Sequence, residues 1–280
     1  NGVVRYIGGT YRDYLACMDT LHENMFSVIW QRMRSEIPIA DRDTMLAVQQ
    51  WMAGSGSPLL QYKVPCATLI CMDAACKNEL GLMNDRICAE ICGGNTEYRG
   101  KESWHNGPYL WSQEMVMSII FGLMVTDFIA KQEKETGRGF VGNIIDIGGG
   151  IGLQPAVVSA ILHANNYNPH AYIIIELPAV ERVGSSFRVH LGTNPNVQYA
   201  DDYSLMETVY WKTLVVSCHA TSQMSSATLK GIFSRLNAIT GGGHSQLHFG
   251  ADCSTVAHLL GSKSTTAETF GGQLVTIRQD

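Results

Sequence analysis

The chain has 280 residues and a formal net charge of −5, and 16% of its residues are charged. Lysine and arginine form no run, so the basic face that nucleic-acid binding requires is not expected. The apolar fraction of 45% is ordinary for a folded protein, and the length allows one large or two modest domains. Composition therefore favours a globular protein and argues against a nucleic-acid partner.

No segment has the pattern of a secretory signal or of a membrane span. Residues 1–10 lack a basic start followed by an apolar block. The most apolar uncharged stretch outside the glycine-rich region, residues 115–126, is too short to cross a bilayer and predicts a buried helix. The chain begins without Met, which is consistent with a piece cut from a longer protein.

The cysteines predict a reducing compartment, most simply the cytoplasm. None of the eight forms a C-x-x-C pair, and a chain of this length does not need disulfides. Five of them cluster within residues 66–92, which leaves two readings open. Buried free thiols are favoured, because steps of five residues do not share a helix face; a metal site is the alternative.

The first half of the sequence predicts an all-helical domain. Apolar residues recur every three or four positions, or Met and Cys recur at helical spacing, in four segments: 12–33, 42–53, 66–80 and 82–92. The plain reading is packing in the core or at a subunit interface, so a homodimer through this domain is one expectation. A substrate pocket lined by methionine is the sharper alternative.

An aromatic turn at residues 102–111 interrupts this helical pattern, just before a long helix expected at 112–134. Trp104, His105 and Tyr109 are candidate ligand-facing residues, because aromatic rings on a loop can stack on a base or shield a cation. The same rings can instead close the core between two domains.

A glycine-rich turn at residues 148–152 organises the second half. The β-branched run before it ends in Asp146, and apolar residues at helical spacing follow in 153–164. Strand, glycine turn and helix form the first unit of a nucleotide-type α/β fold. Glycine allows a sharp turn and close approach to a ligand, and the helix N-terminus should offer unpaired N–H groups.

The spacing of the glycines excludes a dinucleotide fingerprint. G-x-G-x-x-G fails in both frames, because its third glycine would fall on Leu153 or on Pro155. The remaining pattern, D-x-G-G-G-x-G, resembles motif I of class I S-adenosylmethionine-dependent methyltransferases, especially those that methylate oxygen on small molecules. The resemblance implies that the turn binds the cofactor, through Asp146, Gly148, Gly149, Gly150 and Gly152.

A second acid stands at the end of the next strand, residues 171–176. Glu176 lies where such folds place the carboxylate that accepts hydrogen bonds from a ribose diol. With Leu177 it forms the run IIIELPAV, which resembles sugar-type O-methyltransferases. The alternative is a chance acid at a strand end.

A third short strand, residues 197–199, is followed by Asp201 and Asp202. In the family, a Gly-Asp-hydrophobic-aromatic turn here implies that the acid accepts from the adenine amino group. Asp201 matches this pattern, whereas Asp202 stands where an apolar residue normally packs on adenine.

The fourth strand, residues 213–218, ends in Ser217 and Cys218, which we expect beside the cofactor, and His219 follows. Ligands in open α/β sheets bind beyond the carboxyl ends of the strands, so His219 should face the transferable methyl and act as general base. The run SCHATSQM is similar to the N..S..EM segment of sugar-type enzymes, with Gln223 in place of the acid. The alternative role for His219 is a helix cap.

The rest of the chain predicts a helix at 227–239 and strands at 244–250 and 272–277. Alternation puts His244, Gln246 and His248 on one face of the first of these strands, which is unexpected for a strand covered on both faces. Either this face is wet, or His248 binds a metal together with Asp252 and His219. Six strands can be placed in all, so we expect either a sheet reduced at its C-terminal edge or an incomplete chain.

The sequence thus predicts an α/β protein with a mostly parallel, Rossmann-like methyltransferase sheet in residues 143–280, and a helical lid, substrate and dimerisation domain in 1–142. The expected function is S-adenosylmethionine-dependent methylation of a hydroxyl on a sugar-like or other small polar molecule, with no metal ligands assigned. Two alternatives stay open: a non-catalytic cofactor-binding or structural subunit, and a metal-assisted methyltransferase.

Overall fold

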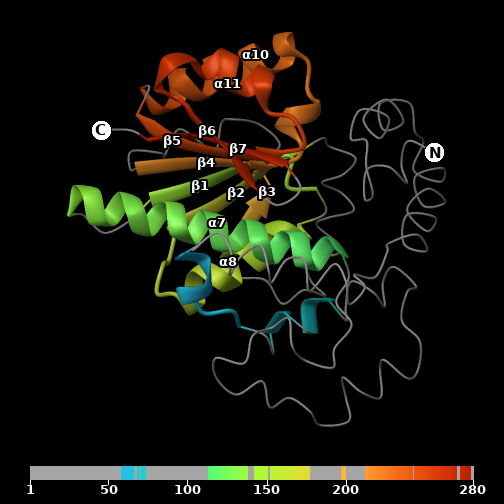
Figure 1. The fold of residues 1–280 in the computed structure, drawn as a ribbon, viewed down its shortest axis with the longest axis vertical. Coiled ribbons are helices and arrows are strands. Elements are labelled where there is room, and N and C mark those ends of the chain that lie inside the picture. Colours follow the sequence, from blue (N-terminus) through green and yellow to red (C-terminus); the bar gives the residue numbers. More distant parts are fainter. Residues whose placement is uncertain are drawn as a thin grey trace, which may run out of the picture.

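The computed structural model of the chain shows one mixed sheet with helices on both faces (Figure 1). The structure describes residues 58–65, 68–69, 71–73, 113–137, 142–150, 152–176, 197–199, 212–241, 243–269 and 272–278. Five of its strands are parallel, and the central one is β1 (Gly142–Ile147). β1 lies between β2 (Ala171–Ile175) and β4 (Lys212–Cys218). β3 (Val197–Tyr199) extends the sheet beyond β2, and β5 (His244–Gly250) extends it beyond β4.

The sheet has seven strands in the order β3-β2-β1-β4-β5-β7-β6, so the expected reduction at its C-terminal edge is wrong. β7 (Gly272–Ile277) runs antiparallel to β5, and β6 (Thr265–Thr269) pairs with it at the edge. The sequence analysis missed β6, because four of its five residues are exposed and it therefore has no apolar alternation. The completed sheet confirms the Rossmann-like methyltransferase fold class.

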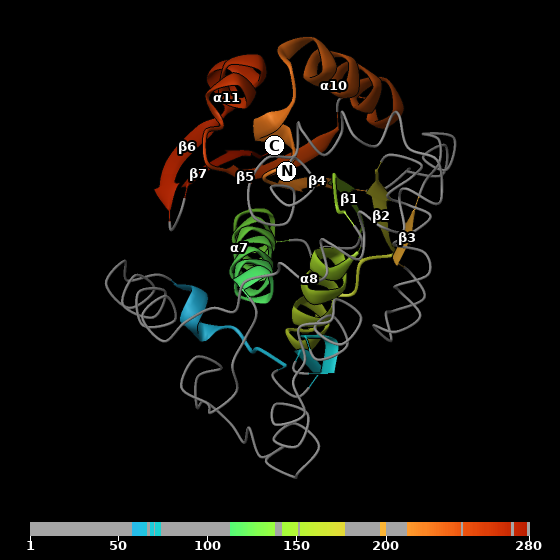
Figure 2. The same cartoon turned by 90° about the vertical axis from the view of Figure 1, so that its right-hand side faces the viewer.

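Each face of the sheet packs on its own pair of helices (Figure 2). On one face lie α7 (Gln113–Thr136) and α8 (Leu153–Ala164), and on the other lie α10 (Ser226–Thr240) and α11 (Ser254–Leu260). Alternate residues of each strand serve the two cores: in β1, Ile144 packs toward α7 and α8, while Ile145 and Ile147 pack toward α10 and α11. Burial on both faces explains the continuous apolar runs of the parallel strands.

Close helix packing under the sheet depends on a small residue. Gly122 of α7 lies against α8, and a Cβ added there would stand 2.7 Å from Cδ1 of Ile161. α7 falls on the N-terminal side of the boundary predicted at 142/143, yet it shares a core with β1, β4 and β5. Most of residues 1–142 lies outside the described ranges, so the division at 142 stays a prediction.

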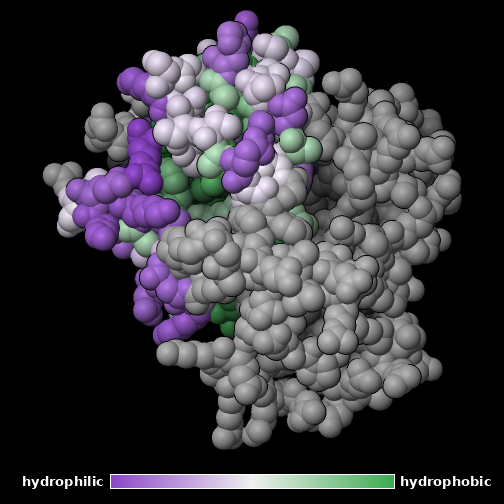
Figure 3. All heavy atoms as spheres, in the orientation of Figure 1, coloured by the Kyte–Doolittle hydropathy of each residue, from purple (hydrophilic) through white to green (hydrophobic). Residues whose placement is uncertain are grey.

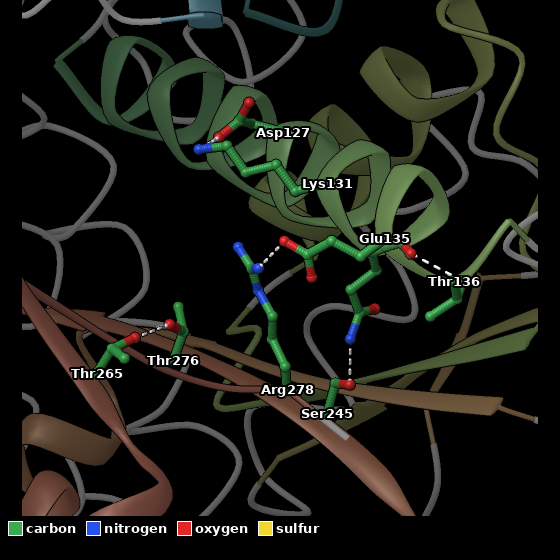
Figure 4. A network of polar contacts seen from close by, with 9 residues as sticks. Asp127, Lys131, Glu135, Thr136, Ser245, Thr265, Thr276 and Arg278 are labelled. Atoms are coloured by element: carbon green, nitrogen blue, oxygen red, sulfur yellow. Dashed lines mark hydrogen bonds and ion pairs between the residues drawn. The ribbon is translucent and has the colours of Figure 1, made fainter. Parts of the chain in front are cut away.

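The C-terminal end of α7 is tied to the sheet by polar side chains (Figure 4). Glu135 accepts from Arg278, which follows β7, and Gln132 donates to the hydroxyl of Ser245 in β5. The guanidinium of Arg278 also lies 5.8 Å from the ring centroid of Phe128. On the face shown in Figure 3, hydrophilic side chains gather over this end of α7, whereas the upper helices carry a mixture of hydrophilic and weakly polar residues. None of the helices in the described ranges is long and apolar enough to span a bilayer.

The polar face of β5 is buried, so the expectation that it is wet is wrong. His244, Gln246 and His248 are all buried against α10, and they bond to one another. His244 Nε2 lies 2.8 Å from Gln246 Nε2, and Gln246 Oε1 lies 2.8 Å from His248 Nε2. The face tolerates burial because each polar group finds its partner on the same strand or on a neighbouring element.

Burial of these side chains keeps both histidines, His244 and His248, neutral. Desolvation lowers the pKa of His248 to about 3, and the neighbouring His244 lowers it further; desolvation also lowers the pKa of His244. A histidine whose pKa is lower in the folded than in the unfolded state makes its full contribution to the free energy of unfolding above pH 6.5. That contribution is lost as the pH falls below 6.5, because the unfolded chain then binds the proton first.

We therefore expect His248 to lower the free energy of unfolding as the pH falls from 6.5 to 5, and this effect is the difference between the wild type and His248→Asn, because Asp146, whose pKa burial raises to about 7, acts in the opposite direction in both. Below pH 6.5, His248 alone contributes a slope of about 1.4 kcal/mol per pH unit. Urea unfolding at half-unit steps of pH measures this slope. His248→Asn should reduce it, and His258→Asn, at an exposed histidine of α11, is the matched control. An unchanged slope in His248→Asn would contradict the assignment.

Candidate active site

The predicted site residues lie where the carboxyl ends of β1, β2 and β4 meet. These three strands are adjacent and parallel, so Asp146, Glu176 and His219 come from one edge of the sheet. Asp146 pairs in register with Ile174 and Val216, one residue before β1 ends. Burial raises the pKa of Asp146, and the charge of Glu176 is close enough to raise it further.

The glycine turn follows β1 directly and uses backbone conformations that side chains disfavour. Gly148, Gly150 and Gly152 have φ values of 76°, 61° and 94°, in the left-handed region. Their amides are already bonded: Gly148 N–H donates to Ile175 O at 2.8 Å, and Gly152 N–H to Gly149 O at 3.2 Å. The amide of Gly150 also has a partner, because it donates to Glu176. The unpaired N–H groups expected at the N-terminus of the helix that follows stay a prediction.

Gly149 has an ordinary φ but no room for a side chain. A Cβ there would lie 2.8 Å from Cγ2 of Ile174, 2.9 Å from Cγ of Pro155 and 3.4 Å from Cγ of Asp146. The turn therefore lies directly on β2, on the first turn of α8 and on the carboxylate of Asp146. Its glycines serve the path of the backbone.

Asp146 is fully buried, with only one carboxylate oxygen bonded. Oδ2 accepts from the hydroxyl of Tyr172 at 2.8 Å and from Nε2 of Gln154 at 3.3 Å. Within the described ranges nothing donates to Oδ1. Desolvation, supported by the charge of Glu176, raises the pKa of this carboxyl to about 7. An unpaired buried carboxylate oxygen is costly, and a ligand that donates to it would remove that cost.

Glu176 supports the glycine turn with its side chain. Its Oε2 accepts from the N–H of Gly150 at 2.9 Å. A carboxylate offers about four acceptor positions, so this bond does not prevent it from accepting from a ligand diol. Turn and acid are thus coupled, and a ligand in contact with Glu176 lies at the glycine turn.

His219 stands two residues beyond Ser217, in a strained backbone conformation. Its φ is 64°, in the left-handed region that residues other than glycine adopt uncommonly, although histidine does so more often than most, and residues in such conformations cluster at active sites. Its N–H donates to Phe249 O at 2.6 Å, and its ring meets the Phe249 ring edge-on at 5.0 Å between centroids. Burial lowers its pKa, so the ring is neutral at pH 7.

The alternative role of His219 as a helix cap is not supported. The helical turn that follows, η3 (Thr221–Gln223), has Ala220 at its N-cap, and no side chain caps it. α10 is capped by Ser225, whose hydroxyl accepts from Thr228 N–H at 3.2 Å.

Ser217 joins the His219 turn to the end of β1. Its hydroxyl donates to Ile147 O at 2.9 Å and accepts from Thr221 N–H at 3.2 Å. Cys218, half-buried and not in a disulfide, follows in β4. The roles of Ser217 and Cys218 in binding a ligand stay predictions.

Several predicted residues lie outside the described ranges, so their roles stay predictions as well: Trp104, His105, Tyr109, Leu177, Asp201 and Asp202. Sequence reasoning missed Tyr172 and Gln154 as partners of Asp146. Tyr172 looked like one more large residue of a buried strand, and Gln154 like a residue of the first helical turn. The signal available in the sequence was the hydroxyl of Tyr172 and the amide of Gln154, which can both donate to an acid near the end of a strand.

The metal site suggested for His248, Asp252 and His219 is not formed. No group of three potential ligands occurs among the described residues. Both ring nitrogens of His248 are within hydrogen-bond distance of Gln246 and Thr221. Asp252 is exposed and accepts from Ser254 N–H at 2.9 Å.

No family model matches the chain, and no curated protein matches it in sequence. Solved structures with a similar fold include three methyltransferases. The tRNA methyltransferase TrmK of B. subtilis is 13% identical, with a TM-score of 0.38, over 57% of this chain and 65% of its own. The magnesium protoporphyrin IX methyltransferase of Synechocystis, with bound S-adenosylmethionine, is 10% identical, with a TM-score of 0.40, over 59% and 81%.

The third is an O-methyltransferase of neocarzinostatin biosynthesis, in complex with S-adenosylmethionine and 2-hydroxy-5-methyl naphthoic acid. It is 12% identical, with a TM-score of 0.37, over 59% of this chain and 58% of its own. This chain thus spans less than two thirds of the first and third of these proteins. We base the fold assignment on strand order and direction alone.

A pair of glycine substitutions tests how tightly the turn is packed. Gly149→Ala should lower the free energy of unfolding by about 1–3 kcal/mol, because its Cβ overpacks the turn. Gly231→Ala, in α10 with nothing within 4 Å of the added Cβ, should raise it by about 0.5–1 kcal/mol. Chemical denaturation measures both, and equal effects would contradict the packing described here.

Proposed function

We propose that this chain is an S-adenosylmethionine-dependent methyltransferase that methylates a hydroxyl oxygen on a small molecule. One observation carries the proposal: an unpaired oxygen of buried Asp146 lies under the glycine turn, and Glu176 bonds to the same turn. The turn follows β1, and His219 follows the neighbouring parallel strand β4, so both lie at one edge of the sheet. The seven-stranded sheet is the fold on which this chemistry is expected.

The residues present fit the cofactor. The turn offers a close backbone approach without Cβ atoms, and Asp146 Oδ1 needs a donor. Glu176 can accept from a ribose diol while it holds the turn. The proposed contacts are the residues at the ends of β1, β2, β3 and β4: Asp146, Gly148, Gly149, Gly150, Gly152, Glu176, Leu177, Asp201, Asp202, Ser217 and Cys218.

When bound, S-adenosylmethionine supplies an electrophilic methyl group on a sulfonium. We assign to His219 the task of accepting the proton of the acceptor hydroxyl at a ring nitrogen. Burial lowers its pKa below 6.5, so the ring is neutral and able to accept at pH 7. Its strained backbone is held by Phe249, which keeps the ring at the edge of the sheet.

The rest of the proposal concerns the first half of the chain. Residues 1–142 form a helical domain that covers the site, excludes water and offers a dimer contact, and 143–280 bind the cofactor. Trp104, His105 and Tyr109 face a small, sugar-like substrate. No nucleic acid or membrane takes part, and the protein works in the cytoplasm without a metal.

A non-catalytic subunit that keeps the cofactor-binding sheet is the second candidate. Gln223 and Asp202 favour it, because each departs from the pattern of the family that this region resembles. The two candidates share the cofactor and differ in turnover, so binding and activity must be measured separately.

Binding should depend on the two acids. Calorimetry with S-adenosylmethionine should show about 10- to 100-fold weaker binding for Asp146→Ala and Glu176→Ala, because each removes a hydrogen bond to a charged group. Glu176→Gln can still accept from Gly150, so it separates support of the turn from contact with the diol. Glu268→Ala, on the exposed strand β6, is the control. Unchanged binding in both alanine variants would remove the cofactor assignment.

Turnover should depend on His219. His219→Ala should lower kcat about 10²- to 10⁴-fold and leave S-adenosylmethionine binding intact, because the ring is assigned to the proton and not to the cofactor. In the wild type, kcat should fall on the acid side with a midpoint below pH 6.5, since the base works unprotonated. Full activity in the alanine variant would refute the role, and cofactor binding without any turnover would favour the non-catalytic candidate.

A further inference from the structure

A chain of hydrogen bonds runs across the buried face of β5 and ends at the turn that carries His219. From the end of α10 it links Thr240, His244, Gln246, His248 and Thr221, with distances of 2.8 Å for the first three links and 3.2 Å for the last. None of the five residues is among the proposed contacts of the cofactor or the substrate. Thr221 lies two residues beyond His219.

The direction of this chain is fixed at its far end. The hydroxyl of Thr240 donates to Leu236 O at 2.9 Å, so it accepts from His244 Nδ1–H. A neutral His244 then has a bare Nε2, which accepts from the amide of Gln246. The Oε1 of Gln246 accepts from His248 Nε2–H, which leaves Nδ1 of His248 bare. Thr221 must therefore donate its hydroxyl proton to His248.

This last bond orients one side of the His219 turn. The backbone N–H of Thr221 donates to Ser217 Oγ, which in turn donates to Ile147 O, next to the glycine turn. Ser222 Oγ donates to His219 O at 2.7 Å. The turn is thus fixed to β1, to β4 and to β5, and the hydroxyl of Thr221 is its contact with the buried polar face.

A turn held in this way can carry a strained residue. A residue with a side chain at a φ of 64° is in a sparsely populated backbone conformation, which persists only where the surroundings over-determine it. The bond from Thr221 to His248 is one of those constraints. His248 is itself fixed, because it is fully buried and its ring meets that of Phe233 at 5.6 Å between centroids.

We propose that His248 is a positioning residue for methyl transfer: by accepting from Thr221, it holds the turn in which His219 receives the acceptor proton. This inference rests on the proposed function, because His219 has its role only there. His248 does not touch the substrate or the cofactor, and it acts through Thr221.

The role requires His248 to keep Nδ1 bare, and its surroundings provide for that. Its neighbours across the strands are Ser217 in β4 and Val275 in β7, and Phe233 covers it from α10. Among the described residues, the titratable group that acts on it is His244, which opposes a second positive charge. The groups that shift the pKa of His248 include no carboxylate, which would favour the charged ring.

Two matched pairs of variants test the proposal. Thr221→Val keeps the shape of the side chain and removes the donor, while Thr221→Ser keeps the donor. His248→Leu removes the acceptor, while His248→Asn places an oxygen near the position of Nδ1. Circular dichroism establishes which variants fold, and Thr221→Ala replaces the valine variant if that one does not.

The first readout is the pKa of His219, followed by NMR of its imidazole in the absence of any ligand. In the wild type, in Thr221→Ser and in His248→Asn it should lie below 6.5. In Thr221→Val and His248→Leu it should rise toward 6.5, because a loosened turn admits water to the ring. Loss of stability alone would not move the pKa of the folded protein.

The second readout is kinetic. Thr221→Val and His248→Leu should lower kcat about 10-fold or more, with the KM for S-adenosylmethionine changed less than about threefold, because a displaced base affects the chemical step. Thr221→Ser and His248→Asn should restore most of kcat.

The proposal is overturned if the valine and leucine variants fold with His219 titrating as in the wild type. It is also overturned if the serine and asparagine variants shift the pKa as much as their partners do. Failure of the proposed function is distinguishable: a wild type that neither binds S-adenosylmethionine nor transfers a methyl group refutes that function. The NMR pairs still decide whether His248 and Thr221 position His219.

Discussion

Burial of the central strand β1 on both faces is the constraint on which the rest of the site depends. A strand covered in this way has no access to water, so the acid near its end must find donors inside the protein or on a ligand. Tyr172 and Gln154 satisfy one oxygen of Asp146, and the other is left without a donor in the described structure. The protein thus keeps a carboxylate with a raised pKa directly under a turn that side chains cannot fill.

The ends of the neighbouring strands are joined to this centre by hydrogen bonds. Glu176 holds the glycine turn from β2, and Ser217 holds the end of β1 from β4. Through Thr221 the same connection reaches the buried histidines of β5. A change in any of these side chains therefore affects the backbone path of the candidate site as well as its own contact, and matched substitutions are needed to separate the two.

Much of this arrangement could be predicted from the sequence, because parallel strands carry strong apolar runs and their ends must meet at one edge. The expected helix at 153–164 and the strands at 244–250 and 272–277 agree with the structure. Asp146, Glu176 and His219 were placed at the same edge for the same reason. Strand β6 could not be found, because its exposed residues carry no periodic signal.

The polar face of β5 was misjudged for a different physical reason. Three polar side chains on alternate positions ordinarily indicate water, and only their tertiary partners, such as Thr221 and Thr240, reveal that they satisfy one another in the core. The state of the glycine amides was likewise beyond the sequence. Whether an N–H is committed to Ile175 or left for a ligand depends on distances that the order of residues does not specify.

The short edge strand β6 affects how the protein associates with other copies of itself. A strand at the border of a sheet presents peptide groups to which another chain can add, and long apolar borders invite fibrils. Here the border has five residues, rich in threonine, and its Glu268 is exposed. An edge strand this short, with a charged residue on it, offers a second molecule few peptide groups to pair with. The edge of the sheet can therefore be exposed to water without promoting aggregation.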